Sequence, residues 1–163
     1  MSTKKEKPPD NAQAAALRLL GRRDYSREEM RRKLAGRGFS PGETDGALEQ
    51  FETRGLLDDR KLARRLAGYY SREKLWGPQK IFQKLTQRGI PADFIRDVIA
   101  TEEESGAVPE RLRKALNQRM KGQDPGSLGP PEKRRLAAHF RQRGYAWDDI
   151  WEALQETGGS VEE

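Results

Sequence analysis

The chain of 163 residues contains no cysteine, only one histidine and no run of 18 apolar residues. Without cysteine it can form no disulfide and offers no thiolate to a metal, which favours a cytoplasmic location. Without a long apolar run it has no segment suited to crossing a bilayer as a helix. Residues 1–11 lack the apolar middle of a secretory signal, and we expect them to form a disordered lead.

Catalytic motifs are absent as well. The sequence has no GxSxG, HExxH, CxxC or GxxxxGK pattern. His139, the single histidine, stands beside Phe140 in a predicted helix, where a basic face explains it better than a general base. The acidic pair Asp58–Asp59 is explained by helix capping. We therefore expect a protein that is not an enzyme and that holds neither a metal nor a cofactor.

The chain contains more charged than hydrophobic residues. Hydrophobic residues make up 34% of the chain and charged residues 36%, which suits helices that each bury one narrow apolar stripe. The formal net charge of +6 favours an acidic partner, either nucleic acid or an acidic protein surface.

A pattern of helix end, glycine and helix start occurs three times, around Gly38, Gly89 and Gly144. An arginine precedes each glycine and an apolar residue follows it. Further residues, apolar except for Thr44, stand four and eight positions before each glycine and six and ten positions after it, on one helix face. Glycine suits the corner because the chain there turns through a positive φ. A chance origin for three such corners is the competing interpretation.

Amphipathic segments before each corner complete units of about 50 residues. We expect these first helices over 12–23, 60–75 and 109–121, with a Gly- and Pro-rich loop at 122–131. The predicted fold class is all-α, with nine helices forming three tandem three-helix repeats stacked into an elongated, curved body. The predicted repeats span 12–57, 58–104 and 105–157, and a flexible tail follows at 158–163.

Charge is sorted by helix in the same order in each predicted repeat. The first helices, counted over 12–23, 59–75 and 108–121, carry formal charges of +3, +4 and +4. The second, counted over 27–37, 78–88 and 132–143, carry +3, +3 and +4, and the third, counted over 41–54, 91–104 and 147–157, carry −3, −4 and −4. Acidic third helices could form ion pairs with their basic neighbours. Alternatively, the basic helices form a face that binds an acidic partner. The sequence pattern is the same in both cases, so both interpretations stay open.

The second interpretation predicts a basic face that contacts a partner protein or DNA. Lys80, Lys84 and Arg88 follow one another at a spacing of four with no acid between them, which suits a row of phosphates or carboxylates. Trp76, beside a Gly-Pro helix boundary, is the aromatic residue that we expect to be most exposed and a candidate contact. The predicted face consists of Arg31, Arg32, Lys33, Arg37, Arg72, Lys74, Lys80, Lys84, Arg88, Lys133, Arg134, Arg135, Arg141 and Arg143.

Three stretches carry a resemblance to a known family. They are ALRLLGRRDYSREEMRRKLAGRGF (16–39), GLLDDRKLARRLAGYYSREKLWGPQKIFQKLTQRGI (55–90) and RRLAAHFRQRGYAWDDIWEAL (134–154). Together they resemble the RecX family of bacterial regulatory proteins, over nearly all of 12–157. The middle stretch is the most specific, with its double acid, its Gly-Pro and its final Gly-Ile. Leu62 stands where the family usually has phenylalanine, a conservative change in packing.

The resemblance implies an all-helical protein of tandem three-helix repeats that has no cofactor and no active site. It implies binding to the RecA recombinase filament on single-stranded DNA, with modulation, mostly inhibition, of its ATPase, strand-exchange and coprotease activities. We expect a monomer. The main alternative is a basic helical-repeat protein that binds DNA without any recombinase target. A structural scaffold and a helix-turn-helix repressor are further alternatives.

Overall fold

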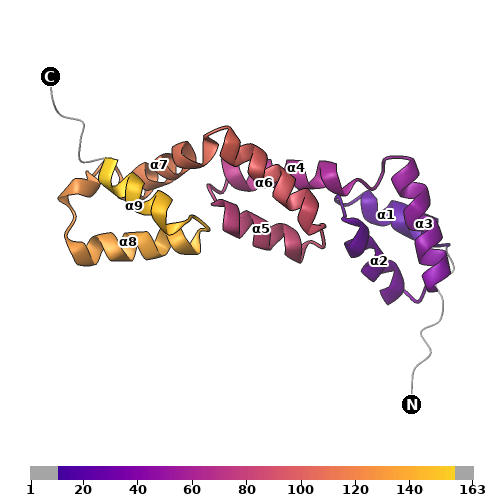
Figure 1. Ribbon diagram of the computed structural model, residues 1–163. Helices are drawn as coiled ribbons and strands as arrows, with labels where there is room; N and C mark the ends of the chain where they lie inside the picture. Colours follow the sequence, from indigo (N-terminus) through magenta and orange to yellow (C-terminus); the bar gives the residue numbers. More distant parts are fainter. Residues whose placement is uncertain (1–10, 157–163) are drawn as a thin grey trace, which may run out of the picture.

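The computed structural model describes residues 11–156, and all regular structure in this part of the chain is helical (Figure 1). The predicted lead, apart from Asn11, and the predicted tail at 158–163 lie outside the described residues. Between Asn11 and Glu156 the structure has nine α-helices and one 3₁₀ turn, which confirms the expected helix number. These elements are α1 (Ala12–Leu20), α2 (Arg27–Gly36), α3 (Pro41–Thr53), α4 (Asp59–Arg72), α5 (Pro78–Gln87), α6 (Ala92–Glu104), α7 (Ala107–Met120), η1 (Pro125–Ser127), α8 (Pro130–Gln142) and α9 (Trp147–Glu156).

Several helices begin at capping residues that are recognisable in the sequence. Ser26 and Ser40 each form a capping box, in which the serine and the glutamate three residues later satisfy one another's backbone N–H groups. The carboxylate of Asp58 accepts a hydrogen bond of 3.0 Å from a backbone N–H in the first turn of α4. The capping interpretation of this acidic residue is therefore confirmed.

The three corner glycines end their helices in the same way. Gly38, Gly89 and Gly144 have φ values of +91°, +74° and +96°, which glycine adopts without the steric cost of a Cβ. The residue after each glycine donates its N–H to the carbonyl five residues before it, at 3.3, 3.2 and 3.2 Å. Those three residues are Phe39, Ile90 and Tyr145, and all are buried. Each corner therefore folds back onto the helix that it ends.

Helix boundaries differ from the predictions in several places, and three of the differences have a local physical cause. α1 ends at Leu20 instead of residue 23, because Gly21 takes the C-cap position. α4 ends at Arg72, and Leu75 then turns the chain with a φ of +51°. α8 begins at Pro130, inside the predicted loop, because proline is accepted in the first turn of a helix.

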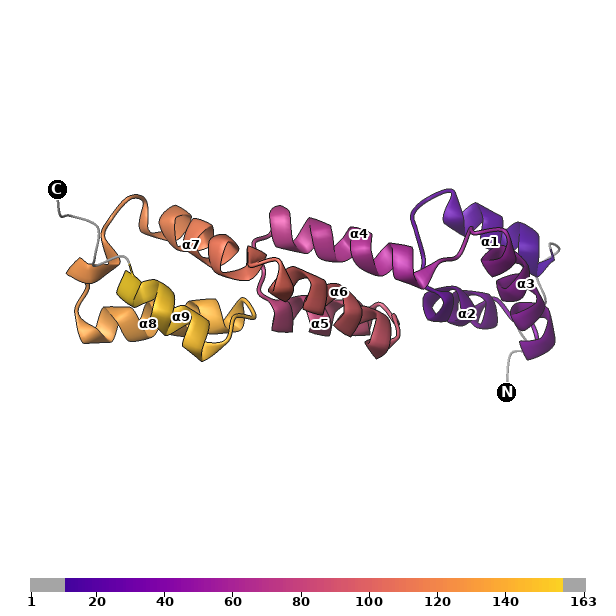
Figure 2. The ribbon, with the colours of Figure 1, turned by 45° about the horizontal axis from the view of Figure 1, so that its top comes forward.

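The apolar side chains form three separate core clusters. One cluster joins α1, α2 and α3, a second joins α4, α5 and α6, and a third joins α7, α8 and α9. Leu75, in the segment between α4 and α5, packs into the third cluster. Figures 1 and 2 show the three groups of helices in a row, so the described part of the chain is elongated.

Two further features are absent from residues 11–156. No helix there is long and apolar enough to span a membrane. The same residues contain no group of three or more His, Cys, Asp or Glu side chains placed to hold a metal ion.

Candidate partner-binding surface

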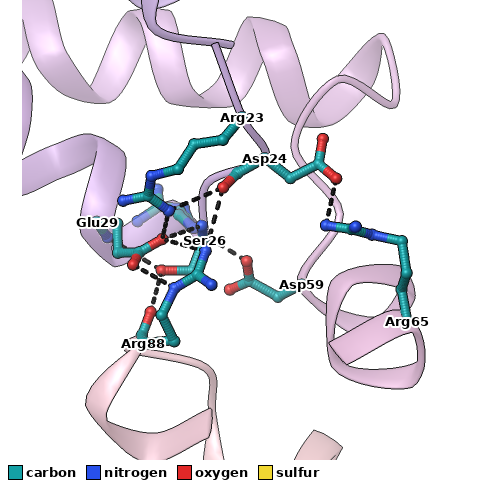
Figure 3. Close-up of polar contacts among 8 residues, drawn as sticks. Arg23, Asp24, Ser26, Glu29, Asp59, Arg65 and Arg88 are labelled. Atoms are coloured by element: carbon teal, nitrogen blue, oxygen red, sulfur yellow. Dashed lines mark hydrogen bonds and ion pairs between the residues drawn. The ribbon is translucent and has the colours of Figure 1, made fainter. Parts of the chain in front are cut away.

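Arg88, at the corner between α5 and α6, extends from the second helix group to the start of α2 in the first (Figure 3). Its Nε lies 2.5 Å from Oε1 of Glu29, and one terminal nitrogen lies 3.1 Å from the other carboxylate oxygen. The guanidinium also donates to the carbonyl oxygen of Asp24. The two charged side chains are only 21% and 14% exposed. Arg88 therefore joins two helix groups instead of standing open on the predicted basic face.

Glu29 is held in its charged form at this first junction. Burial disfavours the carboxylate, but hydrogen bonds from Arg88, from the backbone N–H of Ser26 and from Arg23 outweigh it, together with the positive charge of Arg88. The pKa of Glu29 is therefore lower than its ordinary value of 4.5. Ser26 adds a second link, because its hydroxyl donates to the carbonyl oxygen of Arg88.

Asp59 strengthens the same junction from the start of α4. Its Oδ1 accepts a hydrogen bond of 2.9 Å from the backbone N–H of Arg27, the first residue of α2. Burial raises the pKa of the Asp59 carboxyl, and this outweighs the hydrogen bond from Arg27. Arg65, also on α4, forms an exposed ion pair with Asp24 (Figure 3). The first junction thus combines a backbone link with pairs of opposite charge.

The second junction brings the corner between α8 and α9 against the start of α5. The N–H of Gly77 donates to the carbonyl of Arg143 at 2.8 Å, and that of Gln79 donates to the carbonyl of Gly144 at 3.0 Å. The two backbones are so close that a Cβ on Gly77 would overlap Gly144, and a Cβ on Gly144 would overlap the backbone of Lys80. Glycine is thus required on both sides of this contact.

Tyr145 fixes the second junction from inside the third core. It is fully buried, and its hydroxyl donates a hydrogen bond of 2.9 Å to the carbonyl oxygen of Leu75. Leu75 itself is buried in that core, so the segment before α5 is anchored to the third helix group. Burial raises the pKa of the Tyr145 phenol, which therefore stays protonated and able to donate.

The two junctions share one plan but differ in charge. At the first junction the carbonyl of Arg88 accepts a hydrogen bond from Ser26, the N-cap residue of α2. At the second junction the carbonyl of Arg143 accepts one from Gly77, the N-cap residue of α5. Three residues after that N-cap stands Glu29 in the first junction and Lys80 in the second. Arg88 thus forms an ion pair with Glu29 at the first junction, whereas a lysine takes the place of that glutamate at the second.

Positive charges consequently gather across the second junction. The pKa of Lys80 is lowered by burial and then by the charges of Arg143 and Lys84. The pKa of His139 is lowered by burial and then by the charges of Arg119, Arg143 and Lys80. We refer to these five residues, Lys80, Lys84, Arg119, His139 and Arg143, as the α5–α8 basic cluster. Its four lysine and arginine members favour an anionic neighbour, because a negative charge would offset the repulsion among them.

Other residues of the predicted basic face have acidic neighbours. Arg31 and Arg32 form ion pairs with Glu28 on their own helix, at 3.5 and 3.2 Å. Arg72 lines a cavity of about 750 Å³ beside α6 and α7, together with Glu102. Acidic neighbours therefore partly neutralise these three members of the predicted face.

The remaining predicted residues are at least partly open to solvent. Arg141 donates to the side chain of Gln79 and to the carbonyl of Tyr145, and so belongs to the second junction. Arg143 also donates to the carbonyl of Lys74. The exposed or half-exposed remainder consists of Lys33, Arg37, Lys74, Lys133, Arg134 and Arg135.

Trp76 is not the most exposed aromatic residue, contrary to the sequence-based expectation. It is half-buried, its ring stacks on Tyr70 with centroids 4.7 Å apart, and the ammonium of Lys80 lies 4.5 Å from its centroid. Trp147 is more open, with 45% of its surface exposed. Packing against Tyr70 explains the difference, because two large rings bury each other's faces. Trp76 thus contacts a cation of the basic cluster through its ring.

Ion pairs also link the acidic third helices to their neighbours, as the first interpretation of the charge pattern predicted. Such pairs connect α3 with α2, α6 with α4, and α9 with α7. They are Arg27–Glu52 at 2.5 Å, Arg60–Asp97 at 3.4 Å and Arg113–Glu156 at 2.7 Å. The sorted charges therefore serve, at least in these three pairs, to link the helices within each group.

Sequence reasoning missed the residues that fix the junctions. The local pattern marks Glu29 only as a capping residue, because an ion pair across 59 positions leaves no local signal. Tyr145 did carry a signal, because a hydroxyl at a position otherwise held by Phe39 and Ile90 requires a buried partner. Two closely facing glycines, Gly77 and Gly144, gave no sign of their contact in the sequence.

Taken together, the described residues form an elongated helical protein whose three helix groups meet at two fixed junctions, one of them strongly basic. Comparison with known proteins identifies the class. The family models for the first and second three-helix domains of RecX match residues 12–51 and 58–99, which cover α1–α3 and α4–α6. The chain belongs to the RecX family of regulatory proteins.

Individual relatives agree with this assignment. The chain is 32% identical to the regulatory protein RecX of Trichlorobacter lovleyi over 148 residues, which cover 91% of this chain and 96% of the relative. It is 43% identical to that of Thermus thermophilus over 104 residues, 63% of this chain and 71% of the relative. The crystal structure of RecX from Lactobacillus salivarius is similar in fold, with a TM-score of 0.79 at 17% identity over 90% of this chain and 94% of that one.

Proposed function

We propose that this chain binds the RecA recombinase filament on single-stranded DNA and modulates, mostly by inhibition, its ATPase, strand-exchange and coprotease activities. Membership of the RecX family and the elongated row of helix groups support this function. The observation that carries it is the second junction, where the backbone of Gly144 lies against that of Lys80 and the charge of Arg143 lowers the pKa of this lysine, whereas the first junction has an ion pair. The protein acts in the cytoplasm, as a monomer when dilute, without a cofactor or an active site.

The three helix groups are proposed to be copies of one repeat, spanning 12–57, 58–104 and 105–157. Equivalent corners and equivalent junction hydrogen bonds support this assignment. A row of such repeats can contact successive subunits of a helical filament. Several weak contacts of this kind give a combined affinity far above that of one contact, because each bound repeat raises the effective concentration of the next.

The α5–α8 basic cluster is proposed as the centre of the contact surface. DNA phosphates or acidic side chains of the filament would neutralise its like charges, and the affinity would fall as salt screens the attraction. The exposed members of the predicted face, Arg134 and Arg135 among them, would extend the surface along α8. Bridging of neighbouring subunits would exclude a second DNA strand or hold the filament in a state that turns over ATP slowly.

The alternative function is binding to DNA with no recombinase target, and the basic cluster also favours it. The two functions differ in what they predict for naked DNA. One experiment separates them: the RecA ATPase on single-stranded DNA is measured with increasing amounts of this protein, alongside its binding to naked DNA at two salt concentrations. The proposal predicts ATPase inhibition at protein concentrations that leave naked DNA largely unbound. Equal affinity for DNA with and without RecA, and an unchanged ATPase, would favour the alternative.

A further inference from the structure

The two junctions inside the chain repeat the same set of contacts. In each, the carbonyl of the arginine before the corner glycine, Arg88 or Arg143, accepts a hydrogen bond from the N-cap residue of α2 or α5 in the neighbouring group. In each, the guanidinium of that arginine donates to a carbonyl in the loop before this helix, that of Asp24 or Lys74. The corner glycine, with its positive φ, lies against the first turn of the same helix. A corner on one helix group and a helix start on the next thus form a matched pair of surfaces.

At one end of the row a corner surface has no helix start beside it, and at the other end a helix-start surface has no corner beside it. The corner Arg37–Gly38 lies at the end of α2 that points away from the second group, and the start of α8 lies at the opposite end of the molecule (Figures 1 and 2). Gly38 has the same left-handed conformation as the two docked corner glycines. Neither leftover surface is used by the junctions that the structure describes.

The start of α8 also repeats the charge arrangement of the first junction. Glu132 stands three residues after the N-cap Gly129, as Glu29 does after Ser26. Its Oε2 accepts the N–H of Gly129 at 2.9 Å, as that of Glu29 accepts the N–H of Ser26 at 3.0 Å. An arginine arriving there would therefore meet a carboxylate placed like the one that binds Arg88.

Both end surfaces are accessible. Glu132 and Gly38 are exposed and Arg37 is half-exposed, and neither Arg37 nor Glu132 forms an ion pair with any other residue of the range 11–156. The preceding turn η1 packs against α9 and leaves the first turn of α8 open. The end surfaces are complementary in charge, positive at Arg37 and negative at Glu132.

We propose that these two ends bind one another between copies of this chain, so that Arg37 of one copy pairs with Glu132 of the next. The contact joins two different surfaces, and it therefore extends a row of molecules head to tail instead of closing a symmetric dimer. Pro130 and Pro131 have no N–H to donate, so the ion pair carries most of the attraction. Association is accordingly weak in dilute solution and becomes substantial where an elongated partner aligns successive copies.

Charge reversal tests this contact without any RecA or DNA, so its outcome is independent of the proposed function. Sedimentation velocity at low salt should show an average sedimentation coefficient that rises with protein concentration for the natural sequence. Arg37→Glu or Glu132→Arg alone should weaken this association by about tenfold or more, because like charges then face one another. Mixing the two variants should restore it, since the glutamate introduced at position 37 then meets the arginine introduced at position 132. A sedimentation coefficient that stays constant up to roughly 1 mM, or no recovery on mixing, would overturn the proposal.

Discussion

The guanidinium of Arg88 lies 2.5 Å from the carboxylate of Glu29, although 59 positions separate the two residues in the chain. This ion pair sets the second helix group against the first. At the second junction the charge of the equivalent arginine, Arg143, lowers the pKa of Lys80, and hydrogen bonds between the two backbones hold the helix groups together without an ion pair. The first junction therefore contains an ion pair, whereas the second contains positive charges without an acid among them, and these are the charges that we propose contact a partner.

Replacement of Glu29 by glutamine should weaken the first junction. The loss of a largely buried, charge-assisted hydrogen bond should lower the free energy of unfolding by about 2 kcal/mol. Urea unfolding measures it, and Glu28→Gln, which removes only exposed pairs, should change stability by about 0.5 kcal/mol or less. Because the pKa of Glu29 is lowered by folding, its stabilisation is present above pH 4.5 and is lost as the pH falls through the folded-state pKa. The difference between Glu29→Gln and the natural sequence should thus vanish in acid, and a constant difference would contradict this assignment.

Replacement of Gly144 by alanine should open the second junction. The new Cβ would overlap the backbone of Lys80, and the residue would keep a φ of +96° that alanine rarely adopts. We expect a loss of about 2 kcal/mol or more and a larger radius of gyration in small-angle X-ray scattering. Gly46→Ala, in open space on α3, is the control and should stabilise the protein by about 0.5–1 kcal/mol. An unchanged scattering profile for Gly144→Ala would show that this contact does not fix the junction.

Replacement of Tyr145 by phenylalanine should loosen the segment before α5. The variant keeps the ring in the core but leaves the buried carbonyl of Leu75 without its donor, at a cost of about 1–3 kcal/mol. Hydrogen exchange should become faster around 75–81 and stay unchanged in α1–α3. Uniformly faster exchange along the whole chain would instead indicate a general loss of stability.

Replacement of Asp59 by asparagine should stabilise the protein at neutral pH. The amide oxygen can still accept the N–H of Arg27, and the buried charge is removed. Because folding raises the pKa of Asp59 above its ordinary 3.8, the charged carboxylate disfavours the folded state at neutral pH, and this penalty fades as the pH falls toward 3.8. Thermal unfolding at several pH values should show a higher midpoint for the variant at pH 7 and no difference near pH 3. A lower midpoint at pH 7 would mean that the carboxylate itself is needed.

The helices could be predicted from the sequence because their signals are local. Ser26, Ser40 and Asp58 cap their helices as expected, and the corner at Gly89 turns with the predicted positive φ. Helix boundaries were harder to predict where one residue type is common both in loops and at helix starts. Pro130 lies in a Gly- and Pro-rich segment that predicts a loop, yet proline also starts helices.

The candidate site was harder to predict, because charge in a sequence does not reveal its partner. Lys84 and Arg88 have the same charge and are four residues apart in the sequence, which predicts the same role for both. Lys84 belongs to the basic cluster, whereas Arg88 forms an ion pair with Glu29. Trp76 stands at a helix boundary, where exposure is a fair expectation, but Tyr70 on the preceding helix covers its ring. Contacts between elements decided each of these outcomes, and no spacing along the chain encodes them.

The most direct test of the central claim removes only the charge of the basic cluster. Lys80→Gln with Lys84→Gln leaves the junction hydrogen bonds in place, and Lys61→Gln with Lys114→Gln is a control with the same loss of charge outside the predicted face. We predict that the first double variant inhibits the RecA ATPase on single-stranded DNA about tenfold less potently and with a weaker salt dependence, and that the control inhibits like the natural sequence. Equal inhibition by both double variants at moderate salt would contradict the account.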